Sequence, residues 1–164
     1  MRAIFVVGFM GAGKSTVGRA LAARLGWEFL DLDDEIEATH RRKISDIFAE
    51  RGEEAFRRIE SAVLQRLLES ADSAVIALGG GAYTIPANRE LLRGHGPTVW
   101  LDCPFDVVQR RVAQFTHRPL ARDPERFAQL YDARRKHYAN ATHRIPVESD
   151  DPEATVDAIL AVLR

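Results

Sequence analysis

The sequence predicts an α/β fold in which a parallel β-sheet is covered by helices. Five short apolar runs alternate with longer segments whose apolar residues recur at helical spacing, and this alternation is typical of parallel strands connected by helices. The first apolar run leads directly into the segment Gly8 to Ser15, GFMGAGKS, which fits the phosphate-loop pattern G-x-x-x-x-G-K-[ST]. A phosphate loop between a strand and a helix indicates a protein that binds a nucleotide.

The expected strands and helices follow one another along the whole chain. Ala3–Val7 is apolar and rich in β-branched residues, as a strand buried on both faces should be, and Thr16 to Leu25 is apolar at helical spacing. Proline in the first turn supports four of the helix starts. We expect strands at Ala3–Val7, Glu28–Asp31, Ala74–Leu78, Thr98–Asp102 and Arg144–Val147. We expect helices at Lys14–Leu25, Asp34–Thr39, Ile44–Arg51, Glu53–Glu69, Pro86–Arg93, Pro104–Gln114, Pro124–Asn140 and Pro152–Leu163.

Length and composition indicate one domain over residues 1–164. With 46% hydrophobic side chains, 164 residues suffice for one sizeable core and are few for two. Lys and Arg number 23 against 24 Asp and Glu, so the net charge of −1 gives no overall attraction to nucleic acid or membrane. The single cysteine, Cys103, favours a reducing compartment. Because Gly8 and Gly11 break the N-terminal apolar run, we expect no signal peptide or membrane span, and a cytoplasmic protein.

The residues of the phosphate loop are of the types that bind phosphate groups and Mg²⁺. Its glycines let backbone N–H groups turn around an oxyanion at the positive end of the following helix, while Lys14 reaches terminal phosphates and Ser15 can hold Mg²⁺. A glycine-rich turn followed by a surface lysine is the alternative. It does not explain why Lys14 and Ser15 stand at the required offset from the last glycine.

Two carboxylates mark the end of the second expected strand. Period-two alternation predicts that Asp31 and Asp33 point to the same side while Leu32 packs inward. One carboxylate would orient Mg²⁺ through its water shell, and the other would accept a hydrogen bond from a substrate hydroxyl and act as a base. The alternative is a helix N-cap at Asp33 or Asp34, which needs only one of these residues.

The third expected strand ends in three glycines, Gly79, Gly80 and Gly81. Such a run costs more backbone entropy than an ordinary turn requires, so we expect the backbone to approach a ligand closely. In an open α/β sheet, ligands bind beyond the carboxyl ends of the strands, which is where this run lies. A flexible loop is the alternative.

Several arginines are candidates for binding an anionic substrate, because a forked guanidinium fixes both the charge and the orientation of a carboxylate. We expect Arg57, Arg118 and Arg134 in the site, although spacing alone does not choose them over Arg58, Arg122 and Arg135. The segment from Phe115 to Asp123 lacks helical period and is expected to form a mobile lid. The five histidines show no metal-ligand spacing, so Mg²⁺ is the only metal implied.

In order, these pieces resemble the shikimate kinase family, P-loop kinases related to the nucleoside monophosphate kinases. The similarity covers nearly the full length of the chain. It begins with GAGKST at Gly11 to Thr16 and FLDLD at Phe29 to Asp33, followed by Gly52-Glu53 and FRRIE at Phe56 to Glu60. It continues with LGGGA at Leu78 to Ala82, RPL at Arg118 to Leu120, and Arg134 four residues before Tyr138.

The resemblance implies a role for each matching residue. Gly11, Ala12, Gly13, Lys14, Ser15 and Thr16 would hold the ATP phosphates, with Mg²⁺ bound by Ser15 and supported through water by Asp31. Asp33 would bind substrate hydroxyls and serve as the base, Lys14 and Arg118 would counter developing charge, and Arg111 would pack on adenine. Arg57 and Arg134 would clamp the shikimate carboxylate beside Gly79, Gly80 and Gly81.

The family also implies an architecture and a reaction. The architecture is a three-layer αβα P-loop kinase fold with a five-stranded parallel sheet, a substrate-binding segment at about residues 32–60 and a lid at about residues 113–123. The reaction is phosphorylation of shikimate by ATP in aromatic amino acid biosynthesis, by a monomer. Departures from the family pattern at Ala121, Lys136, Asp150 and Asp151 concern lid packing and nucleotide affinity.

Two other functions remain open at this point. Another small-molecule kinase on the same scaffold, such as a gluconate kinase, would share the phosphate loop, which does not identify the acceptor. A GTP-dependent switch protein is disfavoured because the sequence has no Asn-Lys-x-Asp segment to read guanine.

Overall fold

The computed structural model describes residues 2–114 and 123–164, which are built around a parallel sheet. Its strands are β1 (Ala3–Val7), β2 (Glu28–Asp31), β3 (Ala74–Ala77), β4 (Thr98–Asp102) and β5 (His143–Pro146), in the spatial order β2-β3-β1-β4-β5. Every neighbouring pair is parallel, with Phe5 of β1 aligned with Ile76 of β3 and Thr98 of β4. The five-stranded parallel sheet that the sequence predicts is confirmed.

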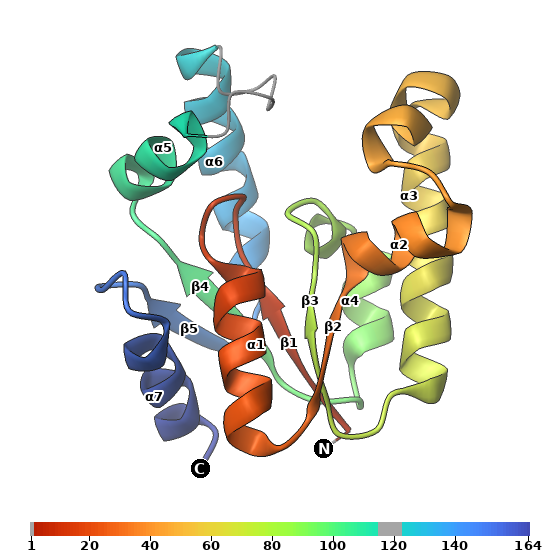
Figure 1. Ribbon diagram of the computed structural model, residues 1–164. Coiled ribbons are helices and arrows are strands. Elements are labelled where there is room, and N and C mark those ends of the chain that lie inside the picture. Colours follow the sequence, from red (N-terminus) through yellow and green to blue (C-terminus); the bar gives the residue numbers. More distant parts are fainter. Residues whose placement is uncertain (1, 115–122) are drawn as a thin grey trace.

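Helices cover both faces of the sheet (Figure 1). They are α1 (Lys14–Leu25), α2 (Leu32–His40), α3 (Ile44–Ser70), α4 (Pro86–Leu92), α5 (Phe105–Ala113), α6 (Pro124–Tyr138) and α7 (Pro152–Val162), with a 3₁₀ turn, η1, at Ala82–Thr84. Figure 1 shows α1 and α7 in front of the sheet and α4 behind it. Arg24 of α1 forms exposed ion pairs with Glu153 and Asp157 of α7. None of the described helices is long and apolar enough to cross a membrane.

The core lies between the sheet and its two helical layers. All residues of β1, β3 and β4 are buried, as expected for parallel strands that are covered on both faces. The largest fully buried side chains include Phe5, Leu21, Leu64 and Leu101, which come from strands and from helices of both layers. The sheet therefore gives a rigid base for the loops at the carboxyl ends of its strands.

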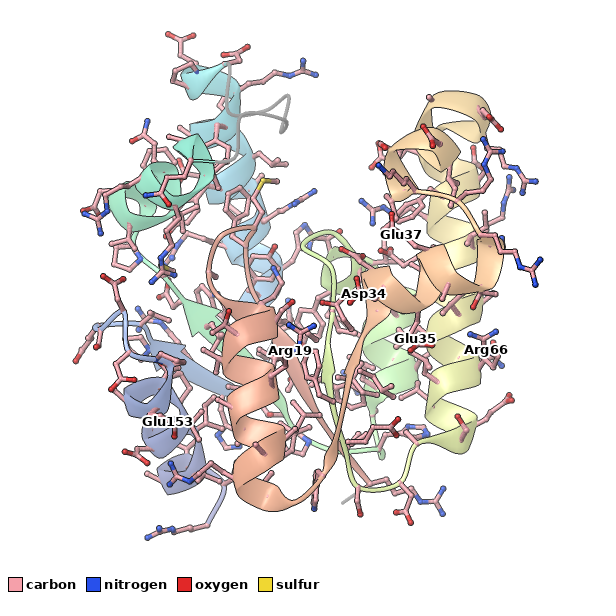
Figure 2. The ribbon with its side chains drawn as sticks, in the orientation of Figure 1. Arg19, Asp34, Glu35, Glu37, Arg66 and Glu153 are labelled. Atoms are coloured by element: carbon pink, nitrogen blue, oxygen red, sulfur yellow. The ribbon has the colours of Figure 1, made fainter. Side chains whose placement is uncertain are left out.

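Two groups of helices rise beside that carboxyl edge, α5 and α6 on one side and α2 with the first part of α3 on the other (Figure 1). The chain breaks helical geometry within α3 at Gly52, with φ 81° and ψ 174°, so the predicted interruption between two helices is confirmed there. α2 is tied to α3 because the Glu37 carboxylate accepts from Ile44 N at 2.9 Å and Arg66 donates to Thr39 Oγ1 at 2.8 Å (Figure 2).

A few boundaries differ from those predicted. β3 ends at Ala77 instead of Leu78, and β5 begins and ends one residue earlier than expected. The larger difference is at α2, which begins at Leu32 instead of Asp34 because the Asp31 side chain caps it. Of the predicted lid, residues 115–122 lie outside the described part of the chain, and these include Arg118, Ala121 and Arg122.

A buried carboxylate anchors α6 to the sheet. Asp102, the last residue of β4, is 7% exposed and accepts two hydrogen bonds from the Arg135 guanidinium and one from Arg144 Nε at 2.7 Å. Burial by itself would raise the pKa of Asp102, but the hydrogen bonds from Arg135 and Arg144 outweigh it and hold this pKa below its usual value. The Arg135 and Arg144 guanidinium groups also lie over the Trp100 ring.

We predict that Asp102→Asn lowers the free energy of unfolding at neutral pH by about 1 to 2 kcal/mol. Because the pKa of Asp102 is lower in the folded state than in the unfolded state, its ionised form stabilises the fold at pH values above the ordinary aspartate pKa of about 3.9. This stabilisation disappears as the pH falls through the folded-state pKa. Urea unfolding at neutral pH and at about pH 3 should therefore show a difference that shrinks on acidification. Asp157→Asn, which breaks an exposed ion pair, is the control and should have little effect. A pH-independent difference would contradict the ionic explanation.

Candidate active site

A cleft of about 700 Å³ lies at the carboxyl edge of the sheet. Its walls are formed by the phosphate loop and the start of α1, by the ends of β2 and β3, and by α5. Among the predicted site residues, the cleft is lined by Gly11, Gly13, Lys14, Ser15, Thr16, Asp31, Asp33, Gly79, Gly80 and Arg111. The structure therefore brings these ten predicted residues together around one cleft.

The phosphate loop connects β1 to α1 through two glycines in the left-handed region. Gly11 has φ 80° and Gly13 has φ 92°, a conformation that side chains disfavour, and Gly13 is the N-cap of α1. The Lys14 ammonium lies across the loop and donates to the Gly8 carbonyl at 2.8 Å and to the Phe9 carbonyl at 3.0 Å. The loop thus places a positive charge and the N-terminus of α1 at the cleft, an arrangement that suits phosphate groups.

Arg111 closes the cleft on the α5 side. Its Nη1 donates to the Gly11 carbonyl at 3.0 Å, and its Nη2 pairs with Asp150 Oδ1 at 2.8 Å. The hydrogen bond from Arg111 holds the pKa of Asp150 below its usual value. Asp150, one of the positions where the chain departs from the family pattern, is therefore the ionic partner of Arg111 in this structure.

Asp31 joins the phosphate loop to α2. Its Oδ2 accepts from Ser15 Oγ at 2.7 Å, and its Oδ1 accepts from the backbone N–H groups of Asp33 and Asp34 at 2.9 and 3.3 Å. The expectation that Asp31 and Asp33 alternate along one strand is wrong, because the chain is already helical at Leu32. The N-cap is Asp31, not Asp33 or Asp34, since an N-cap oxygen accepts from the N–H groups two and three residues later.

Asp33 enters the cleft from the first turn of α2. Burial raises the pKa of its carboxyl group, the negative charge of Asp31 raises it further, and the Lys14 ammonium acts in the opposite direction. A carboxylate in such surroundings is a better proton acceptor than an exposed aspartate. The environment of Asp33 therefore suits a base.

Each glycine of the run after β3 faces a different charged side chain. A Cβ atom on Gly79 would lie 2.6 Å from Asp33 Oδ1, on Gly80 2.9 Å from Arg134 Nη1, and on Gly81 2.3 Å from Arg57 Nη2. The sequence predicted a close approach of this backbone to a ligand. The structure shows that the run also makes room for three of the predicted substrate-binding side chains, which come from α2, α6 and α3.

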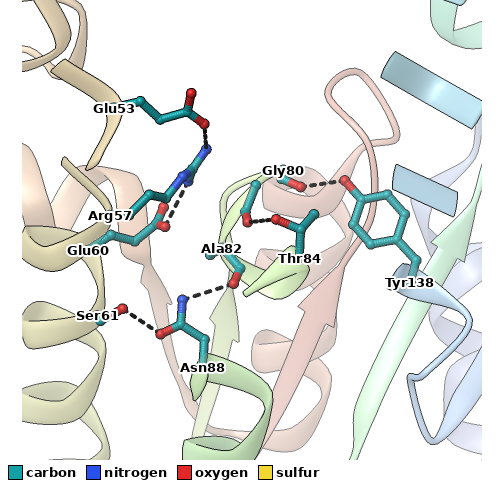
Figure 3. Close-up of polar contacts among 10 residues, drawn as sticks. Glu53, Arg57, Glu60, Ser61, Gly80, Ala82, Thr84, Asn88 and Tyr138 are labelled. Carbon is teal, nitrogen blue, oxygen red and sulfur yellow. Dashed lines mark hydrogen bonds and ion pairs between the residues drawn. The ribbon is translucent and has the colours of Figure 1, made fainter. Parts of the chain in front are cut away.

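The structure separates Arg57 from its neighbour Arg58. The Arg57 side chain is 18% exposed, and its Nη1 pairs with Glu60 Oε1 at 2.8 Å (Figure 3). Arg58 is 73% exposed and points to Glu54, 3.7 Å away. Of the two, Arg57 is thus the residue at the glycine run, a choice that sequence spacing left open.

Glu60 is a site residue that the sequence analysis missed. It is 1% exposed, and this burial raises the pKa of its carboxyl group although the adjacent Arg57 lowers it. A buried carboxylate requires a partner, and its position three residues after Arg57 on α3 supplies one. An acidic residue at an otherwise apolar helix position was the available signal, but it resembles an ordinary surface ion pair in the sequence.

α6 supplies two further contacts to the site. The Arg134 guanidinium lies 5.8 Å from the centre of the Phe9 ring in the phosphate loop, whereas Arg135 turns to Asp102. Tyr138, also missed as a site residue, donates a hydrogen bond to the Gly80 carbonyl (Figure 3). Arg118, the remaining predicted arginine, lies outside the described residues.

The site combines two chemical environments. The phosphate loop, Lys14 and Arg111 present positive charge and N–H donors, while Ser15 and Asp31 place two side-chain oxygen atoms next to each other. Within residues 2–114 and 123–164, no group of three or more His, Cys, Asp or Glu side chains is arranged to hold a metal ion. Beside the loop, Asp33 and two arginines form a pocket edge suited to a hydroxylated anion.

Comparisons with known proteins agree on one family. Residues 10–164 match the family model described as shikimate kinase. The chain is 41% identical to the shikimate kinase of Persephonella marina, with all of both chains covered, and 46% identical to that of Paramagnetospirillum magneticum, covering 97% of this chain and 83% of the relative. The solved structure of shikimate kinase from Acinetobacter baumannii in complex with shikimate is 37% identical, covers 99% of this chain and 93% of that one, and has a TM-score of 0.92.

Proposed function

The chain belongs to the shikimate kinase family, and from this premise we propose that it transfers the γ-phosphoryl group of ATP to a hydroxyl group of shikimate, giving shikimate 3-phosphate and ADP. One observation supports this assignment above all others. Asp33, Arg57 and Arg134 converge on the glycine run next to the phosphate loop, so one carboxylate and two guanidinium groups lie beside the proposed phosphate donor site.

The phosphate loop is the proposed ATP site. Residues Gly11 to Thr16 would surround the phosphates, and Lys14 would exchange its contacts with the Gly8 and Phe9 carbonyls for phosphate oxygens. Arg111, held by Gly11 and Asp150, would contact the adenine base. Phosphoryl transfer depends mostly on positioning and on neutralising charge, and these residues would supply both.

We propose Mg²⁺ as the cofactor, with Ser15 and Asp31 as the residues that hold it. The donor set fits this ion, because Mg²⁺ prefers oxygen ligands, keeps several waters and uses phosphate oxygens as further ligands. When bound, it would neutralise charge on the transferred phosphate. Asp31 also caps α2, so the same carboxylate would connect the metal site to the helix that carries Asp33.

Asp33 is the proposed base. Its raised pKa favours acceptance of the proton from the attacking hydroxyl, and its position against Gly79 fixes the carboxylate in the cleft. Arg57 and Arg134 would bind the shikimate carboxylate from opposite sides, together with the backbone of Gly80 and Gly81. The role of Arg118 in stabilising the transferred phosphate, from a closing lid, is proposed from the sequence resemblance alone.

We further propose that the enzyme is a cytoplasmic monomer. The single cysteine, Cys103, is buried and free, which suits a reducing compartment. Sedimentation analysis of the purified protein tests the monomer.

The experiment that tests the reaction is ADP release from ATP and Mg²⁺ with shikimate, gluconate or no acceptor. Release that depends on shikimate, together with shikimate 3-phosphate as the product, would support the proposal. Release with gluconate in place of shikimate would show that the nucleotide site is correctly assigned and that the acceptor is not. Comparing GTP with ATP in the same assay tests the nucleotide.

We predict that Asp33→Asn lowers kcat by about 10²- to 10⁴-fold, the usual contribution of a general base. The same variant should unfold at a higher temperature at neutral pH. The folded-state pKa of Asp33 is raised, so its ionised form destabilises the fold above the ordinary pKa, and a neutral amide removes this cost. Steady-state kinetics and thermal unfolding at neutral pH measure both effects. Asp34→Asn, one residue along α2, is the control and should keep its turnover; near-normal turnover in Asp33→Asn would remove Asp33 from the role of base.

We predict that Arg57→Ala raises the KM for shikimate by about 10- to 100-fold and leaves the KM for ATP nearly unchanged, because charge-assisted hydrogen bonds to the substrate are lost. Arg58→Ala is the matched control, since it removes another arginine side chain, one residue later and on the exposed side of α3. Initial rates over a grid of both substrates separate the two constants. Equal KM values for shikimate in the two variants would exclude Arg57 from the carboxylate site.

A further inference from the structure

The carbonyl groups of the glycine run have a specific pattern of hydrogen bonds. The Gly79 carbonyl accepts from Ala82 N at 3.1 Å and the Gly81 carbonyl from Thr84 N at 3.1 Å, which are local 3₁₀-type contacts. Thr84 Oγ1 adds a second bond to the Gly81 carbonyl at 2.6 Å. The Gly80 carbonyl, between them, receives its hydrogen bond from the Tyr138 hydroxyl on α6 instead of from the local backbone (Figure 3).

This contact fixes the orientation of one peptide group. The Gly80 carbonyl and the Gly81 N–H belong to the same trans peptide, in which the C=O and N–H bonds point in opposite directions. Because the Tyr138 hydroxyl holds the carbonyl on the α6 side, the Gly81 N–H of the same peptide is turned away from that hydroxyl. Glycines rotate easily, so without such a contact this peptide could present its carbonyl to the site instead.

The surrounding charges make the orientation important. Arg57 Nη2 and Arg134 Nη1 lie against Gly81 and Gly80, so the space beside this peptide is bordered by two guanidinium groups. A carboxylate bound there gains from an N–H donor and is repelled by a carbonyl oxygen. The direction of the Gly80–Gly81 peptide therefore affects how well the site binds an anion.

We propose that Tyr138 is a positioning residue for the acceptor carboxylate: its hydroxyl binds the Gly80 carbonyl, fixes the Gly80–Gly81 peptide in one orientation and so leaves the Gly81 N–H available to the carboxylate. This inference rests on the proposed function, which places the carboxylate between Arg57 and Arg134. Tyr138 is suited to the task because it remains a hydrogen-bond donor at any ordinary pH. Burial raises the pKa of this phenol to about 12, although the adjacent Arg134 acts in the opposite direction.

The segment that follows the run is held in place by neighbouring helices, which limits the positions that the Gly80–Gly81 peptide can adopt. Asn88 of α4, which is fully buried, donates to the Ala82 carbonyl at 2.9 Å and accepts from Ser61 of α3 at 2.6 Å (Figure 3). The segment that follows the run is thereby fixed to α3 and α4, while Tyr138 fixes the run itself to α6. Loss of the Tyr138 hydroxyl should free one peptide without unfolding the loop.

The test is Tyr138→Phe, which removes only the hydroxyl. We expect the Kd for shikimate, measured by calorimetry without nucleotide, to rise about tenfold, and the KM for ATP to change by less than about twofold. The methyl ester of shikimate, which lacks the carboxylate charge, should lose much less affinity. Tyr131→Phe is the matched control, because Tyr131 lies on the same helix and donates to the Cys103 carbonyl, away from the glycine run.

The outcomes separate this inference from the proposed function. Three results for Tyr138→Phe would overturn the positioning role. They are an affinity for shikimate that does not fall, a fall that is equal for shikimate and its methyl ester, and a fall no larger than that in Tyr131→Phe. Lower thermal stability with unchanged shikimate affinity would overturn it as well. If the unaltered protein neither binds nor phosphorylates shikimate, the proposed function is wrong. If the unaltered protein does both, and Arg57→Ala weakens shikimate binding but Tyr138→Phe does not, only the positioning role of Tyr138 is wrong.

Discussion

The candidate site depends on the absence of three Cβ atoms. An alanine at Gly79, Gly80 or Gly81 would place a methyl group between 2.3 and 2.9 Å from a charged side chain, and close-packed structures do not accommodate such contacts without moving that side chain. The position of β3 explains why the run lies here. β3 is bordered by β2 and β1, so its carboxyl end is next to both Asp31 and the phosphate loop. Side chains from α2, α3 and α6, far apart in sequence, meet at this central edge.

Several polar and charged groups around this edge have hydrogen-bond or ionic partners within the protein itself. Arg57 pairs with Glu60, Ser15 donates to Asp31, and Lys14 donates to two loop carbonyls. Burial raises the pKa of both Glu60 and Asp33, but Glu60 has Arg57 as its ionic partner, whereas the charge of Asp31 further disfavours the ionised form of Asp33. A carboxylate kept in such a position reduces stability, and this is typical of functional sites, where activity requires a group that the fold alone would not select. The carboxylate of Asp102 shows the opposite case, since its two arginine partners lower its pKa and it serves the fold.

The sequence predicted the fold closely because its signals were local and consistent. Apolar runs, proline at helix starts and the phosphate-loop pattern each depend on a few neighbouring residues, and the observed elements differ from the expected ones mostly by one or two positions. The errors occurred where a side chain from one element determined the geometry of the next. Strand alternation failed at Leu32 because the Asp31 carboxylate starts a helix there. Glu60 was missed because its burial is visible only in three dimensions, and Tyr138 because its contact with Gly80 joins residues far apart in the sequence.

Paired arginines illustrate what sequence spacing cannot resolve. Arg57 and Arg58, like Arg134 and Arg135, are adjacent on a helix, and adjacent side chains differ in direction by about 100°. Only one member of each pair can therefore face the glycine run, and the other must find a different environment. For Arg58 this environment is solvent, whereas for Arg135 it is the buried carboxylate of Asp102 at the end of β4. Because Arg135 is held by the sheet, the rotation of α6 is fixed, and with it the direction of Arg134 and Tyr138. The ionic contact at β4 and the polar contact at Gly80 thus belong to one arrangement, in which the sheet orients α6 and α6 orients the glycine run.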